Sequence, residues 1–200
     1  EKSIGVSNIV NGATRLQPVV LGIGQASGVL AALAVKQHKL PSQVPIRAVQ
    51  STLLDQGAYI MPFIDVPNTD PHFKILHQIG ATGILKGAGI PYKWANQTWF
   101  YPEREMSEFE LMQGLRLYYP VLETNWGASG EALTVQSFID LLKFVHVERT
   151  ADEIIQILVN NDIKKTFSAH HKLNRREISV LLQDILNVFD RDVNYQGNLM

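Results

Sequence analysis

Apolar side chains recur along most of the chain at spacings of three and four residues, the period of a helix with one buried face. This pattern predicts helices over residues 24–38, 45–56, 72–79, 108–118 and 134–146, and two more that open at Thr150 and Asn174. Ser107 and Thr134 stand where helix N-caps are expected. The aromatic residues 94–102 predict a loop, and the polar residues 190–200 predict a frayed end. The expected fold class is therefore mainly α, with short strands at most.

The most apolar stretch, Leu16 to Val35, carries no formal charge over twenty residues. A bilayer-spanning helix needs about that length. Gln17, Pro18 and Gln25 interrupt the stretch, and its second half is rich in Ala and Gly, which supply little apolar volume. The sequence therefore favours a helix buried on all sides in a folded domain and predicts no transmembrane span.

A domain boundary is expected near residue 60. Residues 59–66 are apolar and interrupted by prolines, as in a linker that enters a new domain. We therefore predict a first domain over residues 1–58 and a second over 60–200. The sequence begins Glu-Lys-Ser, without an initiator Met or a basic and then apolar leader, so we expect an internal piece of a longer protein.

Composition narrows the possible chemistry. Hydrophobic residues make up 46% and charged residues 18%, and the formal net charge is −1, which gives no general attraction to nucleic acid or anionic membranes. The absence of cysteine excludes disulfides, thiolate metal sites and a Cys nucleophile. His170 and His171 are adjacent and lack an accompanying carboxylate motif, so no metal site is predicted. No Ser-His-Asp pattern or P-loop occurs, and catalytic residues stay unknown.

The segment Gly22 to Gly28, GIGQASG, is the strongest candidate for ligand binding in the first domain. Glycines let a backbone approach a ligand closely, and a helix that starts after them directs free N–H groups and a partial positive charge at it. Such a helix end binds phosphate or another electron-rich oxygen. The glycine spacing differs from the dinucleotide-binding fingerprint, so tight packing of a Gly/Ala helix in a core is the alternative.

The wider sequence resembles the C-terminal signature of a family of FAD-dependent oxidoreductases. The runs that carry the resemblance are NGATRLQP (11–18), GIGQASG (22–28) and the alanine-rich VLAALAV (29–35). The resemblance implies that a GQAAG-type helix start, with Gly22, Gly24, Gln25 and Ala26, faces the pyrimidine side of the flavin and stabilises negative charge there. Arg15 matches the family's Arg, which faces the flavin or substrate pocket or forms a salt bridge that positions the loop.

The same resemblance limits what the chain does alone. The phosphate-binding glycines of the family's Rossmann half do not occur in this sequence, so FAD is expected in the full-length parent, held through its N-terminal domain. We expect the parent to be a flavin-dependent oxidoreductase that transfers hydride to its cofactor, and this fragment to be non-catalytic by itself.

The second domain resembles S-layer homology repeats, which read F-x-D-V, a helix, L-x-x-x-G-I-x-x-G, a loop, F-x-P and a corner that opens a second helix. The residues that match in order are Asp65, Val66, Gly83, Ile84, Gly87, Phe100, Pro102, Ser107 and Glu110. Two weaker copies follow, which gives repeats over about 62–118, 119–147 and 150–190, the second with an eroded first helix. Such repeats bury their faces against one another, so the resemblance implies a helical repeat module.

In that family an Arg at the corner helps to bind anionic, often pyruvylated, cell-wall polysaccharide. Glu108 and Val135 occupy the corner in the first two copies, and the third keeps the family's pair as Arg175 and Glu177. Arg175 and Glu177 are therefore candidate glycan-binding residues. A charge-reversed corner does not suit an anionic ligand, which favours a packing role for the module as a whole.

Trp94 and Trp99 are the other glycan candidates, because flat aromatic faces suit sugar rings; packing in the core is the alternative. The alternative function for the chain is thus a non-catalytic module that binds a cell-surface glycan or protein. A related possibility is the tail of a polysaccharide-degrading protein of the kind labelled xanthan lyase. These interpretations favour an extracytoplasmic or cell-surface location.

Overall fold

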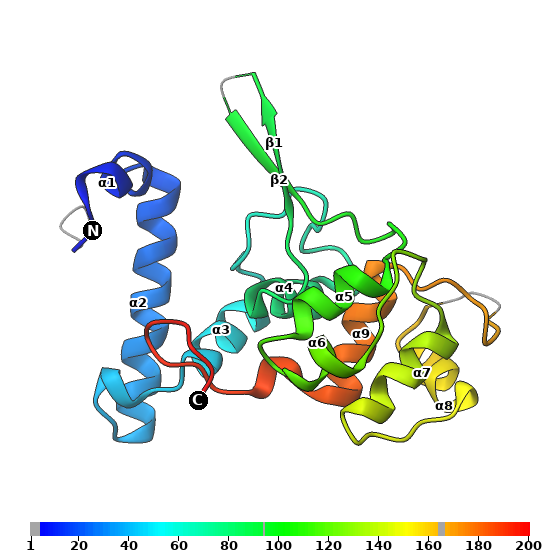
Figure 1. Cartoon of the computed structure of the whole chain (residues 1–200). Helices are drawn as coiled ribbons and strands as arrows, with labels where there is room; N and C mark the ends of the chain where they lie inside the picture. Colours follow the sequence, from blue (N-terminus) through cyan, green and yellow to red (C-terminus); the bar gives the residue numbers. More distant parts are fainter. Residues whose placement is uncertain (1–4, 94, 164–166) are drawn as a thin grey trace. The chain divides into compact units, whose positions relative to one another are not determined.

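The computed structural model describes residues 5–93, 95–163 and 167–200, and the chain divides into two compact units. Unit 1 comprises Glu1–Ala58 with Asp192–Asn198 and Met200, and unit 2 comprises Tyr59–Arg191 with Leu199. The described residues are mainly helical, as predicted (Figure 1). The units are defined by packing, and the assignment of residues 1–58 and 60–200 to two protein families stays a prediction.

Helices and a two-stranded hairpin make up the regular structure. The elements of unit 1 are α1 (Asn8–Thr14), α2 (Gln17–Gln37), η1 (Pro41–Gln43) and α3 (Ile46–Asp55). The elements of unit 2 are α4 (Phe73–Thr82), β1 (Ala88–Tyr92), β2 (Ala95–Trp99), α5 (Glu108–Leu115), α6 (Val121–Asn125), α7 (Val135–Phe144), α8 (Ala151–Asn160), α9 (Arg175–Leu186) and η2 (Val188–Asp190).

Helix α2 is longer than predicted, because it begins at Gln17 instead of Gly24. The expected start followed from reading the glycines of residues 22–28 as a helix start, although Pro18 stands where a first turn tolerates proline. A proline breaks a helix interior, but in the first turn its missing N–H has no helical acceptor and its fixed φ suits the helix. The helix ends at His38, which has the left-handed φ of 53°.

Little of α2 is covered by the other elements of unit 1. Its buried residues are Val20, Val29 and Ala34, so unit 1 alone does not bury the helix on all sides, and its burial in a larger domain stays a prediction. By length and composition alone, α2 could cross a membrane. The predicted absence of a transmembrane span stays a prediction, because a domain surface that lies outside these 200 residues would cover the same apolar side chains equally well.

The end of the chain belongs to unit 1 and is not frayed, contrary to the prediction. Asn194 N–H donates to the Asn198 carbonyl (2.9 Å), and Met200 N–H donates to the Asp192 carbonyl (3.0 Å). The Asn194 side-chain oxygen also accepts backbone N–H groups of the turn. These bonds fold residues 192–200 into a small hairpin turn, which we call the C-terminal hairpin.

Residues 95–99, part of the segment 94–102 predicted as a loop, form the second strand of the β1–β2 hairpin in unit 2. The strands pair antiparallel, from Ala88 opposite Trp99 to Tyr92 opposite Ala95. The hairpin stands out from the helices of this unit in Figure 1. No alternation of apolar and polar residues marks these strands in the sequence, and β1 contains Pro91. A strand at the edge of a sheet tolerates proline, because its outward N–H needs no strand partner.

The centre of unit 2 is a closed ring of three backbone hydrogen bonds. Met106 N–H donates to the Leu173 carbonyl (3.1 Å), Leu173 N–H to the Leu133 carbonyl (2.8 Å), and Leu133 N–H to the Met106 carbonyl (2.7 Å). All three side chains are buried. Each residue stands directly before a helix N-cap, so the ring relates three similar segments by an approximate threefold axis.

The helices that follow the ring residues, α5, α7 and α9, begin in the same way. Their N-caps, two of them predicted, are Ser107, Thr134 and Asn174, and each cap oxygen accepts the N–H three residues on. The first helical N–H donates to a carbonyl of another segment, in the pairs Glu108 to Glu131, Val135 to His171 and Arg175 to Arg104. Each acceptor lies two residues before the next ring residue, which repeats the threefold pattern.

Each of these helices is preceded in the chain by a partner helix. The first segment contains α4 and α5, the second contains α6 and α7, and the third contains α8 and α9. Helix α6 has five residues, and its interpretation as the eroded first helix of a repeat stays a prediction. Neighbouring helices are in contact from α5 through α6, α7 and α8 to α9, and α9 packs against α4. The last segment therefore closes on the first. This is a three-segment helical module, and its kinship with S-layer homology repeats stays a prediction.

Candidate functional site

The first turn of α2 is a positive helix end beside the exposed Arg15. Its N-cap, Leu16, provides no side-chain hydrogen bond, and its first turn has no acidic residue. The first intrahelical bond runs from Val20 N–H to the Leu16 carbonyl (3.0 Å), so the N–H groups of Gln17 and Val19 precede it. A Ser, Thr or Asn side chain caps the N-terminus of α5, α7, α8 and α9, whereas α3, α4 and α6 resemble α2 in having no side-chain cap. An uncapped end attracts an anion or an electron-rich oxygen.

The predicted flavin-contacting residues, Gly22, Gly24, Gln25 and Ala26, lie inside α2 and not at its start. Gly24 is seven residues after Gln17, which places it about 10 Å along the helix axis. Backbone N–H groups in a helix interior donate to carbonyls one turn earlier, so these N–H groups are not available to a flavin. The predicted helix start at these residues is therefore wrong. That the residues contact flavin in some other way stays a prediction.

The glycines instead leave part of α2 open. A Cβ on Gly22, Gly24 or Gly28 would meet no atom within 4 Å. Gly24 and Gly28 are four residues apart and share one exposed side of the helix, which we call the glycine face. A glycine in a helix interior lowers stability by about 1 kcal/mol relative to alanine, and no contact in the described part of the chain offsets this. The glycine face leaves room for another backbone or a ligand.

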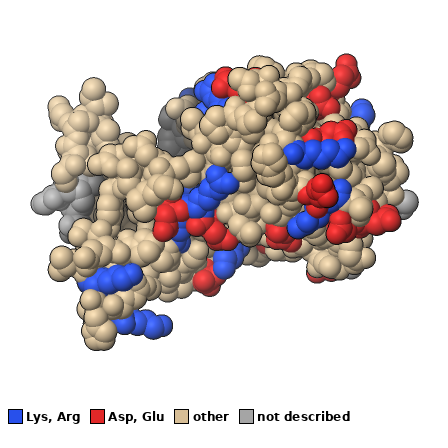
Figure 2. Space-filling view, turned by 60° about the horizontal axis from the view of Figure 1, so that its bottom comes forward, with Lys and Arg blue, Asp and Glu red and all other residues tan. Residues whose placement is uncertain are grey.

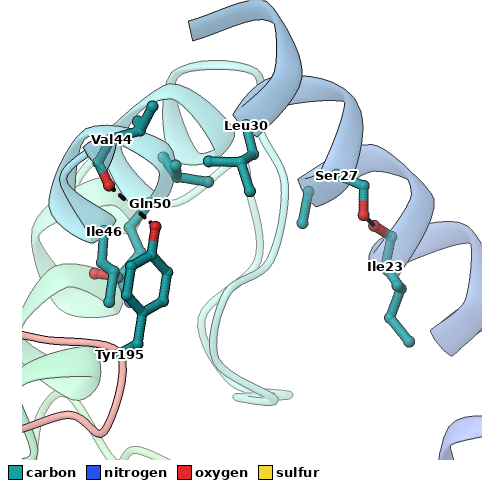
Figure 3. A pocket seen from close by; sticks show the side chains of 9 residues that line it. Ile23, Ser27, Leu30, Val44, Ile46, Gln50 and Tyr195 are labelled. Carbon is teal, nitrogen blue, oxygen red and sulfur yellow. Dashed lines mark hydrogen bonds between the residues drawn. The ribbon is translucent and has the colours of Figure 1, made fainter. Parts of the chain in front are cut away.

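On another side, α2 borders an apolar cavity of about 370 Å³. Its walls are Ile23, Ala26, Ser27, Leu30, Val44, Ile46, Val49, Gln50 and, from the C-terminal hairpin, Tyr195 (Figure 3). The Tyr195 hydroxyl donates to the Pro41 carbonyl (2.7 Å), and the Ser27 hydroxyl donates to the Ile23 carbonyl (2.8 Å). Because the hydroxyl groups already have partners, the cavity presents mainly aliphatic surface. No local signal in the sequence placed Tyr195 here.

Arg175 and Glu177, the predicted glycan-binding residues, are buried in unit 2. The Arg175 guanidinium donates to the carbonyls of Phe100 and Lys86 (2.7 Å each) and to the Glu110 carboxylate (2.5 Å). Burial lowers the pKa of Arg175, and Glu110 opposes that shift. The Glu177 carboxylate accepts the Asn174 N–H (2.9 Å). A sugar reaches neither residue without displacing such protein partners. Their burial counts against the glycan assignment, which stays an untested prediction.

Trp99, another glycan candidate, is partly exposed on β2. Its ring stacks on Tyr101, with centroids 5.7 Å apart and planes inclined by 18°. Trp94 lies outside the described residues. The alternative, that the aromatic residues plug the core, holds for the fully buried Phe100 but not for Trp99 or Tyr101.

A second ion network, which the sequence did not predict, joins the first and third segments. Arg176 donates through both terminal nitrogens to Asp70 (2.7 and 2.9 Å) and through Nε to Glu103 (2.6 Å). Burial opposes the charged form, but the bonds with Asp70 and Glu103 raise the pKa of Arg176 above its usual value. Its acceptors are protein carboxylates, so the network is a structural tie. No group of three potential metal-ligating side chains occurs among the described residues.

The charge distribution adds no strong preference for a charged partner. On the face of the molecule in Figure 2, acidic and basic side chains lie next to one another without a large patch of a single sign. This agrees with the formal net charge of −1. Long-range electrostatic steering of a ligand needs a larger field than such a surface provides.

Residues 1–53 of the 200-residue chain match the model of a protein family described as FAD dependent oxidoreductase. The match includes all of α1 and α2 and most of α3, and it supports an FAD-dependent oxidoreductase region at this end of the chain. No curated protein and no solved structure matches the chain. Unit 2 has no match of its own, so its function rests on the geometry described above.

Proposed function

We propose that this chain is part of an FAD-dependent oxidoreductase, in which unit 1 supplies closing helices of the flavin domain and unit 2 is an accessory helical module. One coincidence carries the proposal. The residues that match the family include all of α2, whose N-terminus has no side-chain cap and whose glycine face is uncovered. An electron-rich ligand would bind at the uncapped N-terminus of α2. A tightly packed domain surface would cover its glycine face.

In this proposal the electron-rich edge of the flavin lies at the first turn of α2. The backbone N–H groups of Gln17 and Val19 and the guanidinium of Arg15 would supply positive charge there. Fixed dipoles of this kind stabilise negative charge that develops on a reduced flavin. FAD, when bound, accepts the hydride. Gly24 and Gly28 would then serve close packing against the remainder of the flavin domain.

The visible absorption spectrum of the purified full-length protein tests this function, taken before and after addition of dithionite. We expect a flavin band that bleaches on reduction. A protein that is colourless, and stays colourless after incubation with FAD, would refute the flavin assignment.

A variant of the glycine face separates a domain contact from a local folding defect. In the 200-residue chain, Gly28→Leu should be tolerated or raise stability by up to about 1 kcal/mol, because the added side chain starts in open space. In the full-length protein the same change should lower flavin content, because the side chain would collide with the covering domain. Equal behaviour of the variant in both backgrounds would contradict a covered glycine face.

We propose further that unit 2 derives from three repeats of the S-layer homology type. The ring through Met106, Leu133 and Leu173 supports this, because the same donor and acceptor positions recur in three segments. A shared fold does not carry a shared ligand, and the burial of Arg175 favours a packing role for the corner. A chain that ends before Thr150 lacks Leu173, the third ring residue, and should lose the cooperative unfolding of unit 2. If thermal unfolding followed by circular dichroism still showed a sharp transition, the ring would not be needed for the fold of this unit.

A further inference from the structure

We propose that the β1–β2 hairpin of unit 2 binds a neutral polysaccharide through one flat side. In an antiparallel pair, opposite residues place their side chains on the same side, and side chains alternate along each strand. The register therefore puts Trp99 and Gln97 on the same side as Ile90 and Tyr92. We call these four residues, together with Tyr101, the aromatic face.

The side chains of the aromatic face are exposed or partly exposed along the hairpin. Tyr92 is 51% exposed and Tyr101 is 36% exposed, and Trp99 and Gln97 are partly exposed. The Trp99 Nε1 donates to the Gln97 Oε1 (3.1 Å), and the rings of Trp99 and Tyr101 stack. The aromatic face runs along the five residues of β2, about 13 Å at the rise of a strand. It is long enough to contact more than one ring of a sugar chain.

The base of this face is held in place by the core. Phe100, between the two outward rings, is fully buried and lies 4.9 Å from Phe63 between ring centroids. The Asp65 carboxylate accepts the N–H groups of Phe100 (2.8 Å) and Tyr101 (2.6 Å). Tyr101 has a φ of 55°, a strained value for a residue with a side chain, and Asp65 keeps it there. A ligand that binds a preorganised surface loses less free energy to ordering it.

The chemistry of the aromatic face suits sugars without charge. The apolar C–H side of a sugar ring stacks on aromatic rings, and its hydroxyl groups pair with an amide such as that of Gln97. Residues 88–99 contain one charged side chain, Lys93, whose Nζ lies 5.4 Å from the centroid of the Tyr92 ring. An anionic polymer would therefore find little countercharge along this face.

The other side of the hairpin and the Arg175 corner lack these properties. The opposite side carries Gly89, Pro91, Asn96 and Thr98, none of them aromatic. Arg175 is buried and donates to protein acceptors. The aromatic face is thus a different site from the corner, takes a ligand of different charge, and does not depend on flavin binding by unit 1.

Affinity electrophoresis of the 200-residue chain tests the proposal, in native gels that contain β-glucan, xylan or galactomannan, and in a separate gel with anionic polygalacturonate. We expect retardation by at least one neutral polymer. Trp99→Ala and Tyr92→Ala should each weaken it by about threefold to tenfold, the value of one aromatic contact. Trp99→Phe, which keeps a ring, should retain most of the binding.

Two matched controls locate the site. Asn96→Ala changes the opposite side of the same hairpin, and Phe109→Ala removes a 50% exposed ring away from it; both should bind as the unchanged chain does. Circular dichroism checks that each variant is folded, and Tyr92→Ala, at the exposed end of β1, remains informative if Trp99→Ala unfolds. The proposal is overturned by no retardation in any neutral polymer, by retardation in polygalacturonate alone, or by unchanged binding in both alanine variants.

Discussion

Replacement of Arg175 by leucine tests how unit 2 closes on itself. The guanidinium of Arg175, at the start of α9, donates to the carbonyls of Phe100 and Lys86 and to the Glu110 carboxylate, all in the first segment. Leucine keeps much of the aliphatic bulk and removes each of these bonds. The variant therefore isolates the polar contribution of a buried cation to ring closure.

We expect Arg175→Leu to lower the free energy of unfolding by about 3–5 kcal/mol, the usual range for breaking a buried ion pair. Two carbonyl groups lose a buried donor, at about 1–3 kcal/mol each. The ring of Phe100, 4.6 Å from the guanidinium carbon, loses a cation–π contact of about 0.5–2 kcal/mol. Burial of the leucine side chain offsets part of this sum by about 1.5–3 kcal/mol.

Arg104→Gln is the matched control, because Arg104 binds the same carboxylate of Glu110 (2.6 and 2.9 Å). Its side chain is 51% exposed, whereas that of Arg175 is 1% exposed. Exposed ion pairs contribute about 0–1 kcal/mol. Two arginines that share one acceptor should therefore differ by roughly 2 kcal/mol or more, because Arg175 is buried and also donates to two carbonyls, whereas Arg104 is exposed.

Urea unfolding followed by tryptophan fluorescence measures this difference in unit 2. The three tryptophans of the chain all lie between residues 59 and 191, so the signal reports on this unit alone. A loss below about 1 kcal/mol for Arg175→Leu would contradict the assigned role of the guanidinium. An equal loss for Arg104→Gln would mean that the Glu110 carboxylate, and not burial of Arg175, sets the stability.

Three further predictions use other features of the two units. His77 is buried, and burial lowers its pKa below 6.5. As the pH drops below 6.5 the unfolded chain takes up this proton more readily than the folded chain, so the free energy of unfolding should fall. His77→Leu should flatten this pH dependence in urea unfolding measured across pH. Gly114→Ala places a Cβ 2.3 Å from the Ile84 carbonyl oxygen, so we expect a loss of about 1–3 kcal/mol; an unchanged urea midpoint would mean that α5 shifts freely. Tyr195→Phe removes the bond to the Pro41 carbonyl, worth about 1 kcal/mol, and hydrogen exchange should quicken in residues 41–55; unchanged exchange there would count against the packing role of the C-terminal hairpin.

Most helices of unit 2, though not α6, were predictable because their starting signals are local. Ser107, Thr134 and Thr150 each accept an N–H only three residues away, and a bond of that span depends on little else in the molecule. Gly83 ends α4 with a φ of 76°, a conformation that glycine adopts at low cost. These residues act through nearest neighbours, so the sequence pattern was sufficient for them.

Unit 1 was predicted only in part, because one local signal was misread. The family resemblance over residues 11–35 agrees with the family match over 1–53, but the glycines of residues 22–28 were taken as the helix start. Pro18 stands in the first turn, α2 starts at Gln17, and Gly24 lies in its interior. The same proline, read as an N-terminal residue, would have placed the positive helix end correctly.

The sequence by itself determined the mainly helical fold, most helix starts and the region related to FAD-dependent oxidoreductases. Tertiary structure alone decided that Arg175 is buried, that Met106, Leu133 and Leu173 close a ring, and that Tyr195 borders a cavity beside α2. Helix caps and turns depend on residues a few positions apart, which a pattern records. Burial and ring closure depend on which distant segments meet, and that is set by the packing of the whole unit.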